Sequence, residues 1–504
     1  MSKKHVSTRF NVLTLPPAHG DGAGSYDIRR KADHSGPREN GAVDPEPDGM
    51  NAQRVVIMGA AGRDFHNFNV LYRGHPEIHV VAFTAAQIPN ISGRVYPPSL
   101  AGPGYPHGIP IVPEKELTDL VRKENVDFVM LAYSDLSEAD VMHKASAVLA
   151  AGPSFVLAGP RATELPSSKP VVSICAVRTG SGKSPLSRYI SKFFRKNGLR
   201  VAVVRHPMPY GDLAAQAVQR FATIEDLDRA RCTIEEREEY EPHLREGVLV
   251  FAGVDYEAIL RQAEKEADVI LWDGGNNDLP FFAPNLQLVV ADPWRAGHEL
   301  SYYPGEVNFR MADVIVISKT DSAPRAAVET VEANAAKVNP RALVARAALN
   351  VSAPDSGRIR GRRVLVVEDG PTVTHGGLDS GAGTLLAERE GAIILDARPF
   401  AVGSIARVYE EYPHLHRILP AMGYSDAQVS DLEATIRKSP AEFVIDGSPI
   451  NLGRLIKLDI PIVDVSYDYE DLGNRVRSRL EEFLRTLPGH PKGAQDAGKA
   501  AQRP

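Results

Sequence analysis

The sequence predicts an α/β protein in which two doubly wound units follow one another. Short apolar runs alternate with charged helical stretches, which is the pattern of parallel strands joined by crossover helices. The alternation pauses near Ser167–Pro170 and restarts at Val171. The chain has 504 residues, 43% of them hydrophobic and 24% charged, so it has an ordinary globular composition and a length that suggests about three domains.

The first unit is predicted over residues 53–166. Its strands are expected at Arg54–Met58, His79–Thr84, Asp127–Tyr133 and Phe155–Leu157. The turn after the first strand, Gly59 to Gly62, departs from the G-x-G-x-x-G pattern, and no acid follows the second strand where a ribose would be bound. We therefore expect a Rossmann-like domain that does not bind NAD.

Polar side chains follow the first strand and are candidates for binding an anionic substrate. They are Arg63, His66, Asn67 and Asn69. His375, in a loop after a later strand, is a fifth candidate of this kind. Structural roles such as helix capping are an equally open interpretation for all five.

The second unit is predicted over residues 170–350. Its strands are expected at Val171–Ala176, Arg200–Val204, Val248–Phe251, Asp268–Trp272, Leu286–Ala291 and Asp313–Ser318. A glycine-rich turn and the helix Pro185–Asn197 follow the first of these strands, and Gly198 is the expected helix stop.

A C-terminal α/β region is predicted over residues 360–487, either as an extension of the second unit or as a separate lobe. Strand-like runs lie at Arg363–Val367, Ala392–Leu395, Glu442–Ile445 and Ile460–Val465, and a final amphipathic helix is expected from Tyr469 to Leu487. The acidic run Glu235–Glu241 is expected to be a solvated helix face. Residues 1–52 and 488–504, rich in Pro and Gly, are predicted to be flexible extensions.

Composition limits the partners that we expect. The net charge of −6, from 58 basic and 64 acidic residues, argues against nucleic-acid binding. The absence of a long apolar run or a signal sequence argues for a cytoplasmic protein with no membrane association. Two cysteines exclude a disulfide framework. A homodimer is considered, but the sequence does not determine the oligomeric state.

The segment from Arg178 to Ser184 predicts a phosphate-binding P-loop, because it follows a strand and precedes a helix. Glycines in such a loop let backbone N–H groups surround a phosphate. Lys183 is expected to contact the β- and γ-phosphates of ATP, and Ser184 to bind Mg²⁺. The nucleotide-binding residues are therefore predicted to include Thr179, Gly180, Ser181, Gly182, Lys183 and Ser184. Val177 replaces the first glycine of the full motif, so a turn without a ligand is the alternative.

Two further strand ends carry candidate nucleotide-site residues. Asp273 ends an apolar strand and is expected to hold Mg²⁺ as a Walker B acid, with a strand-end cap as the alternative. Lys319 and Asp321 lie in a segment that resembles the guanine-reading N-K-x-D motif, with Ser318 in place of Asn. We expect these two residues to contact a purine base of undetermined identity, with an ordinary turn as the alternative.

Arg205 and His206 follow the strand after the P-loop helix. Ligands in doubly wound sheets bind beyond the carboxyl ends of the strands, which favours a place for both residues near the phosphates. Together with Lys183 and Arg178 they are the candidate catalytic residues, because a guanidinium group donates paired hydrogen bonds to a phosphate. Surface charge on a loop is the alternative.

Several segments together resemble cyclic 2,3-diphosphoglycerate synthetases and their bacterial relatives. They are Val56–Asn69, Ala82–Asn90, Cys175–Ser184, Val201–Asp212, Trp272–Asp278, Tyr303–Met311, Val367–Gly377 and Ala421–Ser425. The resemblance implies an ATP- and Mg²⁺-dependent synthetase that closes a phosphoanhydride within 2,3-diphosphoglycerate, or within a related phosphorylated small molecule, and releases ADP and phosphate. It assigns ATP and Mg²⁺ to Lys183, Ser184 and Asp273. It assigns the substrate and the transferring phosphate to Arg178, Arg205, His206 and Arg63.

Two functions of other classes stay open. The segment from Ser318 to Asp321 suggests a P-loop GTPase of regulatory or metallochaperone type. The missing glycine at Val177 suggests a nucleotide-binding scaffold without catalysis.

Overall fold

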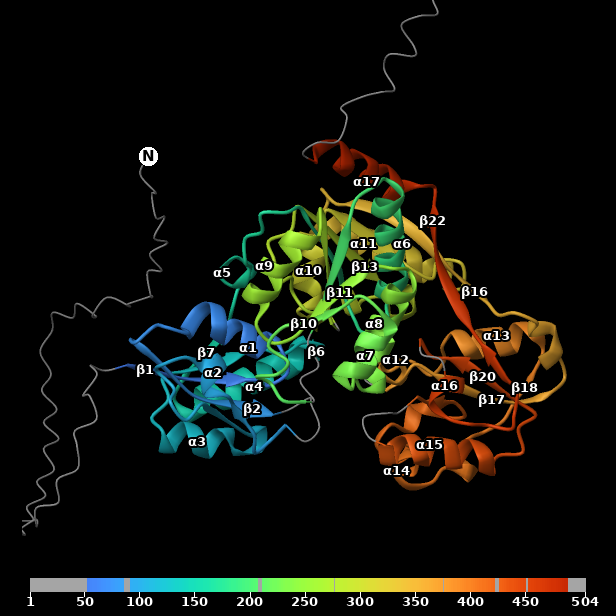
Figure 1. The fold of residues 1–504 in the computed structure, drawn as a ribbon, viewed down its shortest axis with the longest axis horizontal. Coiled ribbons are helices and arrows are strands. Elements are labelled where there is room, and N and C mark those ends of the chain that lie inside the picture. Colours follow the sequence, from blue (N-terminus) through green and yellow to red (C-terminus); the bar gives the residue numbers. More distant parts are fainter. Residues whose placement is uncertain are drawn as a thin grey trace, which may run out of the picture. The chain divides into compact units, whose positions relative to one another are not determined.

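The computed structural model describes residues 52–85, 91–206, 211–275, 277–374, 376–421, 426–449 and 452–487. All of them belong to one compact unit, Gly49–Pro504. The predicted extensions, apart from Ala52, and the candidate residue His375 lie outside the described residues. Three larger sheets follow one another along this part of the chain (Figure 1). A two-stranded antiparallel sheet pairs β6 (Leu136–Ser137) with β14 (Tyr302–Tyr303).

The first sheet has six strands in the order β3-β4-β2-β1-β5-β7. The strands are β1 (Gln53–Met58), β2 (Ile78–Ala85), β3 (Val95–Tyr96), β4 (Ile109–Pro113), β5 (Phe128–Leu131) and β7 (Ser154–Leu157). All pairs are parallel except β3 with β4, and the parallel strands run in the Rossmann order. The helices are α1 (Arg63–Asn67), α2 (Pro98–Ala101), α3 (Leu117–Lys123), α4 (Glu138–Ala151) and α5 (Pro160–Thr163).

The second sheet has nine strands in the order β10-β11-β9-β12-β8-β13-β15-β16-β22. They are β8 (Val171–Ala176), β9 (Val201–Arg205), β10 (Gln219–Phe221), β11 (Leu249–Ala252), β12 (Val269–Asp273), β13 (Leu286–Ala291), β15 (Val314–Ile317), β16 (Leu343–Ser352) and β22 (Ser466–Leu472). Only the two edge strands, β10 and β22, are antiparallel to their neighbours. The inner strands are buried apolar runs, as expected for a parallel sheet covered on both faces.

Helices cover both faces of this second sheet. They are α6 (Lys183–Lys196), α7 (Ile224–Ala230), α8 (Ile234–Arg245), α9 (Tyr256–Glu266), α10 (Gly305–Met311), α11 (Arg325–Val338) and α17 (Arg475–Thr486). Helix α6 buries Leu186, Ile190 and Phe194, which recur every four residues and therefore lie on one face. These side chains share a hydrophobic cluster with Leu480 of α17, so the last helix packs with α6 in the second unit.

The third sheet is parallel, with the strand order β18-β17-β20-β21 and with β19 paired to β17. Its strands are β17 (Arg363–Glu368), β18 (Ile393–Ile394), β19 (Leu419–Pro420), β20 (Phe443–Gly447) and β21 (Ile462–Asp464). Its helices are α12 (Gly370–Val373), α13 (Ala382–Glu390), α14 (Gly403–Glu411), α15 (Asp426–Lys438) and α16 (Leu452–Leu455). We call this part, from β17 to β21, the C-terminal lobe.

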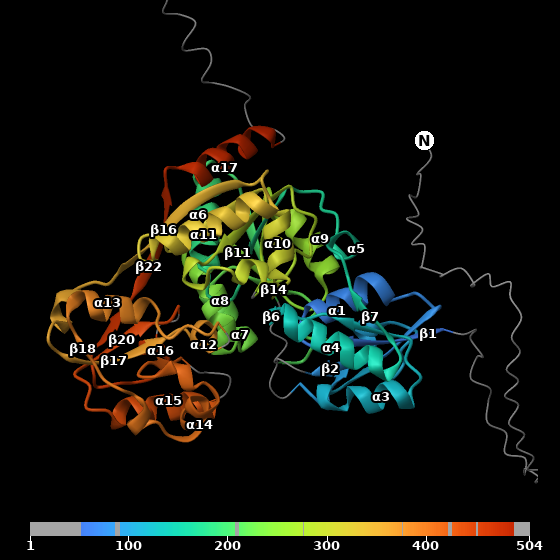
Figure 2. The same cartoon turned by 180° about the vertical axis from the view of Figure 1, so that it is seen from behind.

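The end of the chain differs from the prediction. The helix expected from Tyr469 begins only at Arg475, because Ser466–Leu472 forms strand β22 against β16. Figure 2 shows β22 leading from the C-terminal lobe back to the second sheet, where α17 follows it. The expected α/β class, with a Rossmann-like first unit and a doubly wound second unit, is confirmed.

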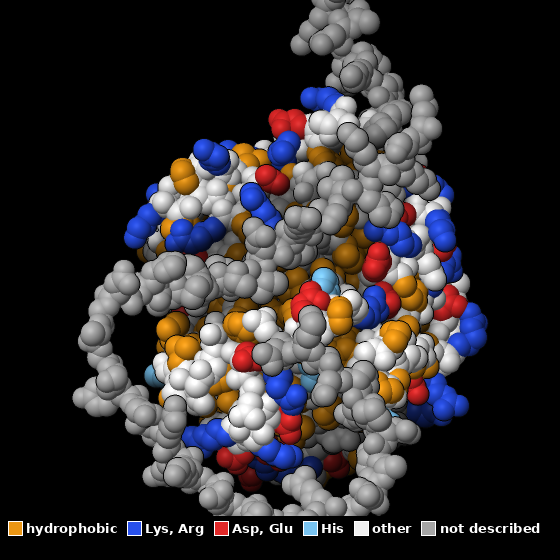
Figure 3. Space-filling view, turned by 90° about the vertical axis from the view of Figure 1, so that its left-hand side faces the viewer, with side chains coloured by type: hydrophobic (Ala, Val, Ile, Leu, Met, Phe, Trp, Pro, Cys, Tyr) orange, Lys and Arg blue, Asp and Glu red, His pale blue; other side chains and the backbone are white. Residues whose placement is uncertain are grey.

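Basic, acidic and hydrophobic side chains are intermixed on the face shown in Figure 3. The acidic run on α8 differs from its prediction as a solvated face, because Glu236, Glu238 and Glu241 are buried. Within the described residues, no helix is both long and apolar enough to span a membrane.

Candidate active site

The P-loop connects β8 to α6 and has the backbone shape that its glycines allow. Gly180 has a φ of +75° and Gly182 a φ of +98°, a region that side-chain-bearing residues rarely adopt. A β-carbon at Gly180 would lie 2.8 Å from Cγ2 of Thr372 in the C-terminal lobe. The P-loop and helix α12 therefore meet closely.

Lys183 and Asp273 form an ion pair at the start of α6. Nζ of Lys183 lies 2.5 Å from Oδ1 of Asp273, and the Arg205 guanidinium lies 2.6 Å from Oδ2. Burial raises the pKa of Asp273, but the charges of Arg205 and Lys183 outweigh this effect and hold it well below its usual range. Burial, assisted by Arg205, lowers the pKa of Lys183 to about 8. Asp273 is thus an ionised carboxylate next to the P-loop.

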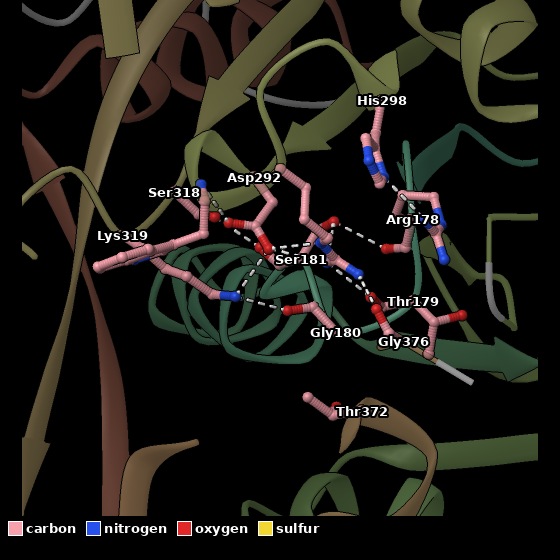
Figure 4. Close-up of polar contacts among 12 residues, drawn as sticks. Arg178, Thr179, Gly180, Ser181, Asp292, His298, Ser318, Lys319, Thr372 and Gly376 are labelled. Atoms are coloured by element: carbon pink, nitrogen blue, oxygen red, sulfur yellow. Dashed lines mark hydrogen bonds and ion pairs between the residues drawn. The ribbon is translucent and has the colours of Figure 1, made fainter. Parts of the chain in front are cut away.

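A second ionic cluster supports the P-loop from the neighbouring strand ends (Figure 4). Arg295 and Lys319 both pair with Asp292, at 2.8 and 3.0 Å. Lys319 also donates to the Gly180 carbonyl at 2.8 Å. Arg295 donates to the carbonyls of Thr179 and Gly376, each at 2.7 Å. Two cations share one carboxylate here, which leaves local positive charge beside the P-loop.

A cavity of about 1100 Å³ opens beside the P-loop. The P-loop, α8 and the end of β13 form one wall, and the C-terminal lobe forms the other. Ligand sites commonly have volumes of about 300–1,000 Å³, so this cavity has room for a nucleotide and a second small molecule. Trp294 lines the cavity with 51% of its surface exposed and offers a flat face to a nucleobase.

The residues at the P-loop fit ATP and Mg²⁺. The glycine conformations allow a phosphate cradle, and Lys183 and Ser184 line the cavity at the N-terminus of a 14-residue helix. Ser184 lines the cavity and could hold Mg²⁺. Asp273 is the nearby carboxylate that could join it, but it is fully buried, pairs with Lys183 and Arg205 and does not line the cavity. Among the residues with a described position, no group of three His, Cys, Asp or Glu side chains is placed to bind a metal.

The other predicted catalytic and base-contacting residues are placed as follows. Arg178 lines the cavity, pairs with Asp135 of the first unit at 2.6 Å and stacks on Tyr302. Arg205 is fully buried and pairs with Asp273 and Glu239, and it does not line the cavity. His206 lies 2.9 Å from Asp278. The Asp321 carboxylate accepts a hydrogen bond from the Leu349 amide at 3.3 Å. Neither His206 nor Asp321 lines the cavity.

The structure places the predicted substrate residues of the first unit away from the P-loop, and Arg63 and His66 are buried against the second unit. Arg63 pairs with Asp278 at 3.0 Å. His66 lies 2.7 Å from the Thr163 carbonyl and stacks on Phe281, and burial lowers its pKa to about 3. Asn67 contacts Met130, and Asn69 contacts Tyr96 and Val254. None of these four side chains lines the cavity at the P-loop.

The turn after β1 is occupied from within. The Asp64 carboxylate accepts hydrogen bonds from the amides of Ala61, Gly62 and Phe65 at 2.8–3.0 Å. In a dinucleotide-binding turn such amides bind phosphate. Here the Asp64 carboxylate takes the place that a phosphate would occupy.

Several cavity residues were missed by sequence reasoning. They are Glu238, Glu239, Trp294, Arg295, Glu368, Asp369 and Thr372. The acids on α8 were interpreted as solvated, although each is followed after four residues by another cavity residue, Pro242 or His243. Glu368 and Asp369 lie at the end of an apolar strand, and this position is the sequence signal that could have identified them as site residues.

Comparisons with known proteins give one close relative. The chain is 55% identical over 435 residues to a protein named arginine synthetase ArcE from Thermococcus kodakarensis, and the match covers 86% of this chain and 97% of that protein. Its name differs from the cyclic 2,3-diphosphoglycerate synthetase that the motifs suggested, while both are named synthetases. A scan against protein-family models finds no match.

The matches to solved structures are weaker. LpxK from Aquifex aeolicus, described in complex with ATP, has a TM-score of 0.38 and 12% identity, over 64% of this chain and 90% of its own. HypB from Archaeoglobus fulgidus has a TM-score of 0.24 and 20% identity, over 36% of this chain and 81% of its own. The near-full-length identity to ArcE decides the family: this chain belongs to the family of the arginine synthetase ArcE.

Proposed function

We propose that this protein is an ATP- and Mg²⁺-dependent synthetase that forms the guanidinium group of arginine. The observation that carries the proposal is the 55% identity to a protein named arginine synthetase ArcE. A P-loop beside a cavity of about 1100 Å³ supports ATP as the energy source.

The precursor follows from the chemistry of the product. Citrulline differs from arginine by a ureido oxygen in place of one guanidinium nitrogen, with the carbon at the same oxidation state. Transfer of the γ-phosphoryl group to this oxygen makes it a leaving group. Ammonia then forms the new C–N bond, and the oxygen departs within phosphate. Citrulline, ATP and ammonia thus give arginine, ADP and phosphate without oxidation or reduction.

The residues around the P-loop would take distinct parts in this reaction. Lys183 would bind the β- and γ-phosphates, and Arg178, which also lines the cavity, would contact the transferring phosphate. Ser184 and Asp273 would hold Mg²⁺, which neutralises charge on the phosphate oxygens when bound. Arg205 is a positioning residue, because it contacts Asp273 and not the cavity.

Cyclisation of 2,3-diphosphoglycerate is the second candidate. The segments that resemble that synthetase family include the P-loop and Val367–Gly377, which meet at the cavity. Two carboxylates of the cavity, Glu238 and Asp369, favour arginine over this candidate, because in their ionised form they would repel a substrate with two phosphates.

The test incubates the purified full-length protein with ATP, Mg²⁺, citrulline and ammonium, and measures arginine by mass spectrometry and ADP by a coupled assay. A parallel reaction contains 2,3-diphosphoglycerate and is followed by ³¹P NMR, and GTP replaces ATP in a third. We expect arginine and ADP in equal amounts, with ATP preferred. Lys183→Met should reduce turnover by about a hundredfold or more. Lys192→Met, which changes a half-exposed lysine of the same helix, is the matched control.

The outcomes separate the candidates. A cyclic phosphoanhydride from 2,3-diphosphoglycerate without arginine from citrulline would replace the first candidate by the second. Neither product, with nucleotide binding intact, would contradict both. Equal use of GTP would favour the GTPase interpretation of the segment from Ser318 to Asp321.

A further inference from the structure

Helix α8 presents an unpaired carboxylate to the cavity. Glu238 is only 7% exposed, and its Oε1 accepts no hydrogen bond from any residue that the structure describes. Glu238, Glu239, Pro242 and His243 all line the cavity, so their shared helix face is turned toward it. A buried carboxylate without a partner costs free energy, which indicates that a ligand group completes the site.

Most other carboxylates of the cavity wall already have partners. Glu239 pairs with Arg205, Asp396 with Arg398 and Glu388 with Arg417. Glu368 accepts four hydrogen bonds from the start of α13. Asp379 is exposed at the rim and contacts Ser380. Glu238 and Asp369 are the two remaining carboxylates of the cavity, and neither has a basic partner in the described part of the chain.

Asp369 faces the cavity from the opposite lobe, next to the P-loop. It is the single residue between β17 and α12 and is partly exposed. One of its carboxylate oxygens accepts a hydrogen bond from the Thr372 hydroxyl. Thr372 abuts Gly180 of the P-loop. A group held by Asp369 would therefore lie near the position of the transferred phosphate.

The negative charges of the two carboxylates repel each other across the cavity. Burial raises the pKa of Glu238 well above its usual range, and the charges of Asp369, Glu235 and Asp446 raise it further. Burial raises the pKa of the Tyr467 hydroxyl of β22 to about 12, and the charges of Asp369 and Glu238 raise it further. A cation bound between the carboxylates would relieve this repulsion.

We propose that Glu238 and Asp369 form the site for the reacting end of the substrate, where they bind the ureido group of the precursor and the guanidinium group of the product. This inference rests on the proposed function and adds the residues that determine the substrate. A planar guanidinium suits the site, because it donates several hydrogen bonds to carboxylates on two sides. The two carboxylates also stabilise the positive charge that appears as the guanidinium forms.

The test measures binding of L-arginine and L-citrulline by calorimetry to the full-length protein with a non-hydrolysable ATP analogue. Glu238→Gln and Asp369→Asn should each bind arginine about tenfold more weakly or worse, and citrulline within about twofold of wild type. Glu388→Gln is the matched control, because it removes the same charge from a cavity residue that is 54% exposed and already paired. It should bind arginine like wild type. Binding of the ATP analogue and thermal unfolding check that each variant is folded.

The result that overturns the site is distinct from the result that overturns the function. Wild-type protein that makes arginine, with both variants binding arginine at wild-type affinity, would reject the site alone. Equal weakening in Glu388→Gln would also reject it, because the effect would then be general electrostatics. Wild-type protein that neither binds nor makes arginine would reject the proposed function together with the site. If Asp369→Asn does not fold, Glu238→Gln decides the test.

Discussion

At the scale of single residues, Arg295 links the P-loop to two neighbouring segments. Its guanidinium pairs with Asp292 and donates to one carbonyl of the P-loop and one of the C-terminal lobe. It is 9% exposed, so these bonds are made with little competition from water. One side chain thereby links the loop that would hold ATP to the segment that follows helix α12 in the C-terminal lobe.

We expect Arg295→Lys to weaken nucleotide binding by about tenfold, because lysine can keep the Asp292 pair but cannot donate to both carbonyls in the guanidinium geometry. A lost hydrogen bond from a charged group costs about 1.5–3 kcal/mol, which exceeds the 1.4 kcal/mol of a tenfold change. Fluorescence titration with a labelled ATP analogue measures the effect. Arg310→Lys, a half-exposed residue paired with Glu306, is the control. Equal affinity in Arg295→Lys and wild type would show that the carbonyl contacts do not shape the P-loop.

At the scale of elements, helix α13 depends on Glu368 for its N-terminus. The carboxylate accepts from the amides of Gly381, Gly383 and Thr384 at 2.7–3.3 Å. A β-carbon at Gly381 would lie 2.4 Å from Oε2 of Glu368, so glycine is needed for this approach. A helix start that is buried needs partners for its amides, and here a strand end supplies them.

Glu368→Ala should therefore expose the start of α13. Loss of an acceptor for several buried amides costs about 1–3 kcal/mol for each group left unsatisfied. We expect faster hydrogen exchange over Ala382–Glu390 and a lower unfolding temperature. Glu388→Ala changes a half-exposed residue of the same helix and should leave exchange at its N-terminus unchanged. Wild-type exchange rates in Glu368→Ala would contradict the capping role.

The elements differ in how far the sequence predicts them. The inner strands were predictable because an apolar run such as Leu286–Ala291 carries its own signal for a parallel sheet. Strand β22 was missed, because Ser466–Leu472 is an edge strand with an alternation of half-buried and exposed residues that depends on its pairing with β16. Strand β22 pairs with residues of β16 that lie 114 to 126 positions earlier in the sequence, from the pair Ser352 and Ser466 to the pair Arg346 and Leu472. No local sequence pattern encodes a pairing over this separation.

The residues of the candidate site also differ in how far the sequence predicts them. The P-loop was predictable, since the chemistry of phosphate binding is contained in one short segment after a strand. That Glu238 and Asp369 line the same cavity was not predictable, because it depends on α8 and the C-terminal lobe meeting there. Arg63 and His66 were plausible ligands by residue type, and only tertiary packing shows them buried against Asp278 and Phe281.

At the scale of the whole molecule, buried polar contacts join the Rossmann-like unit to the second sheet. Arg63 pairs with Asp278 and lies over the ring of Phe281, and His66 stacks on the same ring at 4.1 Å. Burial lowers the pKa of His66 from 6.5 to about 3, with the charge of Arg63 adding to the effect. The junction of the two units thus holds a histidine that must stay neutral.

This junction predicts an acid-sensitive contribution to stability. The pKa of His66 is lower in the folded state than in the unfolded state, so its contribution is present above about pH 6.5 and declines as the pH falls toward 3. Between pH 7 and pH 5 the loss is roughly 2 kcal/mol. His66→Gln keeps a donor for the Thr163 carbonyl, at 2.7 Å from Nε2 in the wild type, but cannot titrate. We expect this variant to be less stable at pH 7, because it loses the ring contact, and to lose less stability on acidification.

Denaturant unfolding at pH 7, 6 and 5 measures this difference. The gap between wild type and His66→Gln should narrow by roughly 2 kcal/mol over this range. His107→Gln, at an exposed position of the same unit, should follow the wild-type curve. Parallel curves for wild type and His66→Gln would mean that the imidazole is protonated without cost and that the junction opens in the folded protein. A narrowing gap would instead establish that the Rossmann-like unit and the second sheet stay packed through His66 until the protein unfolds.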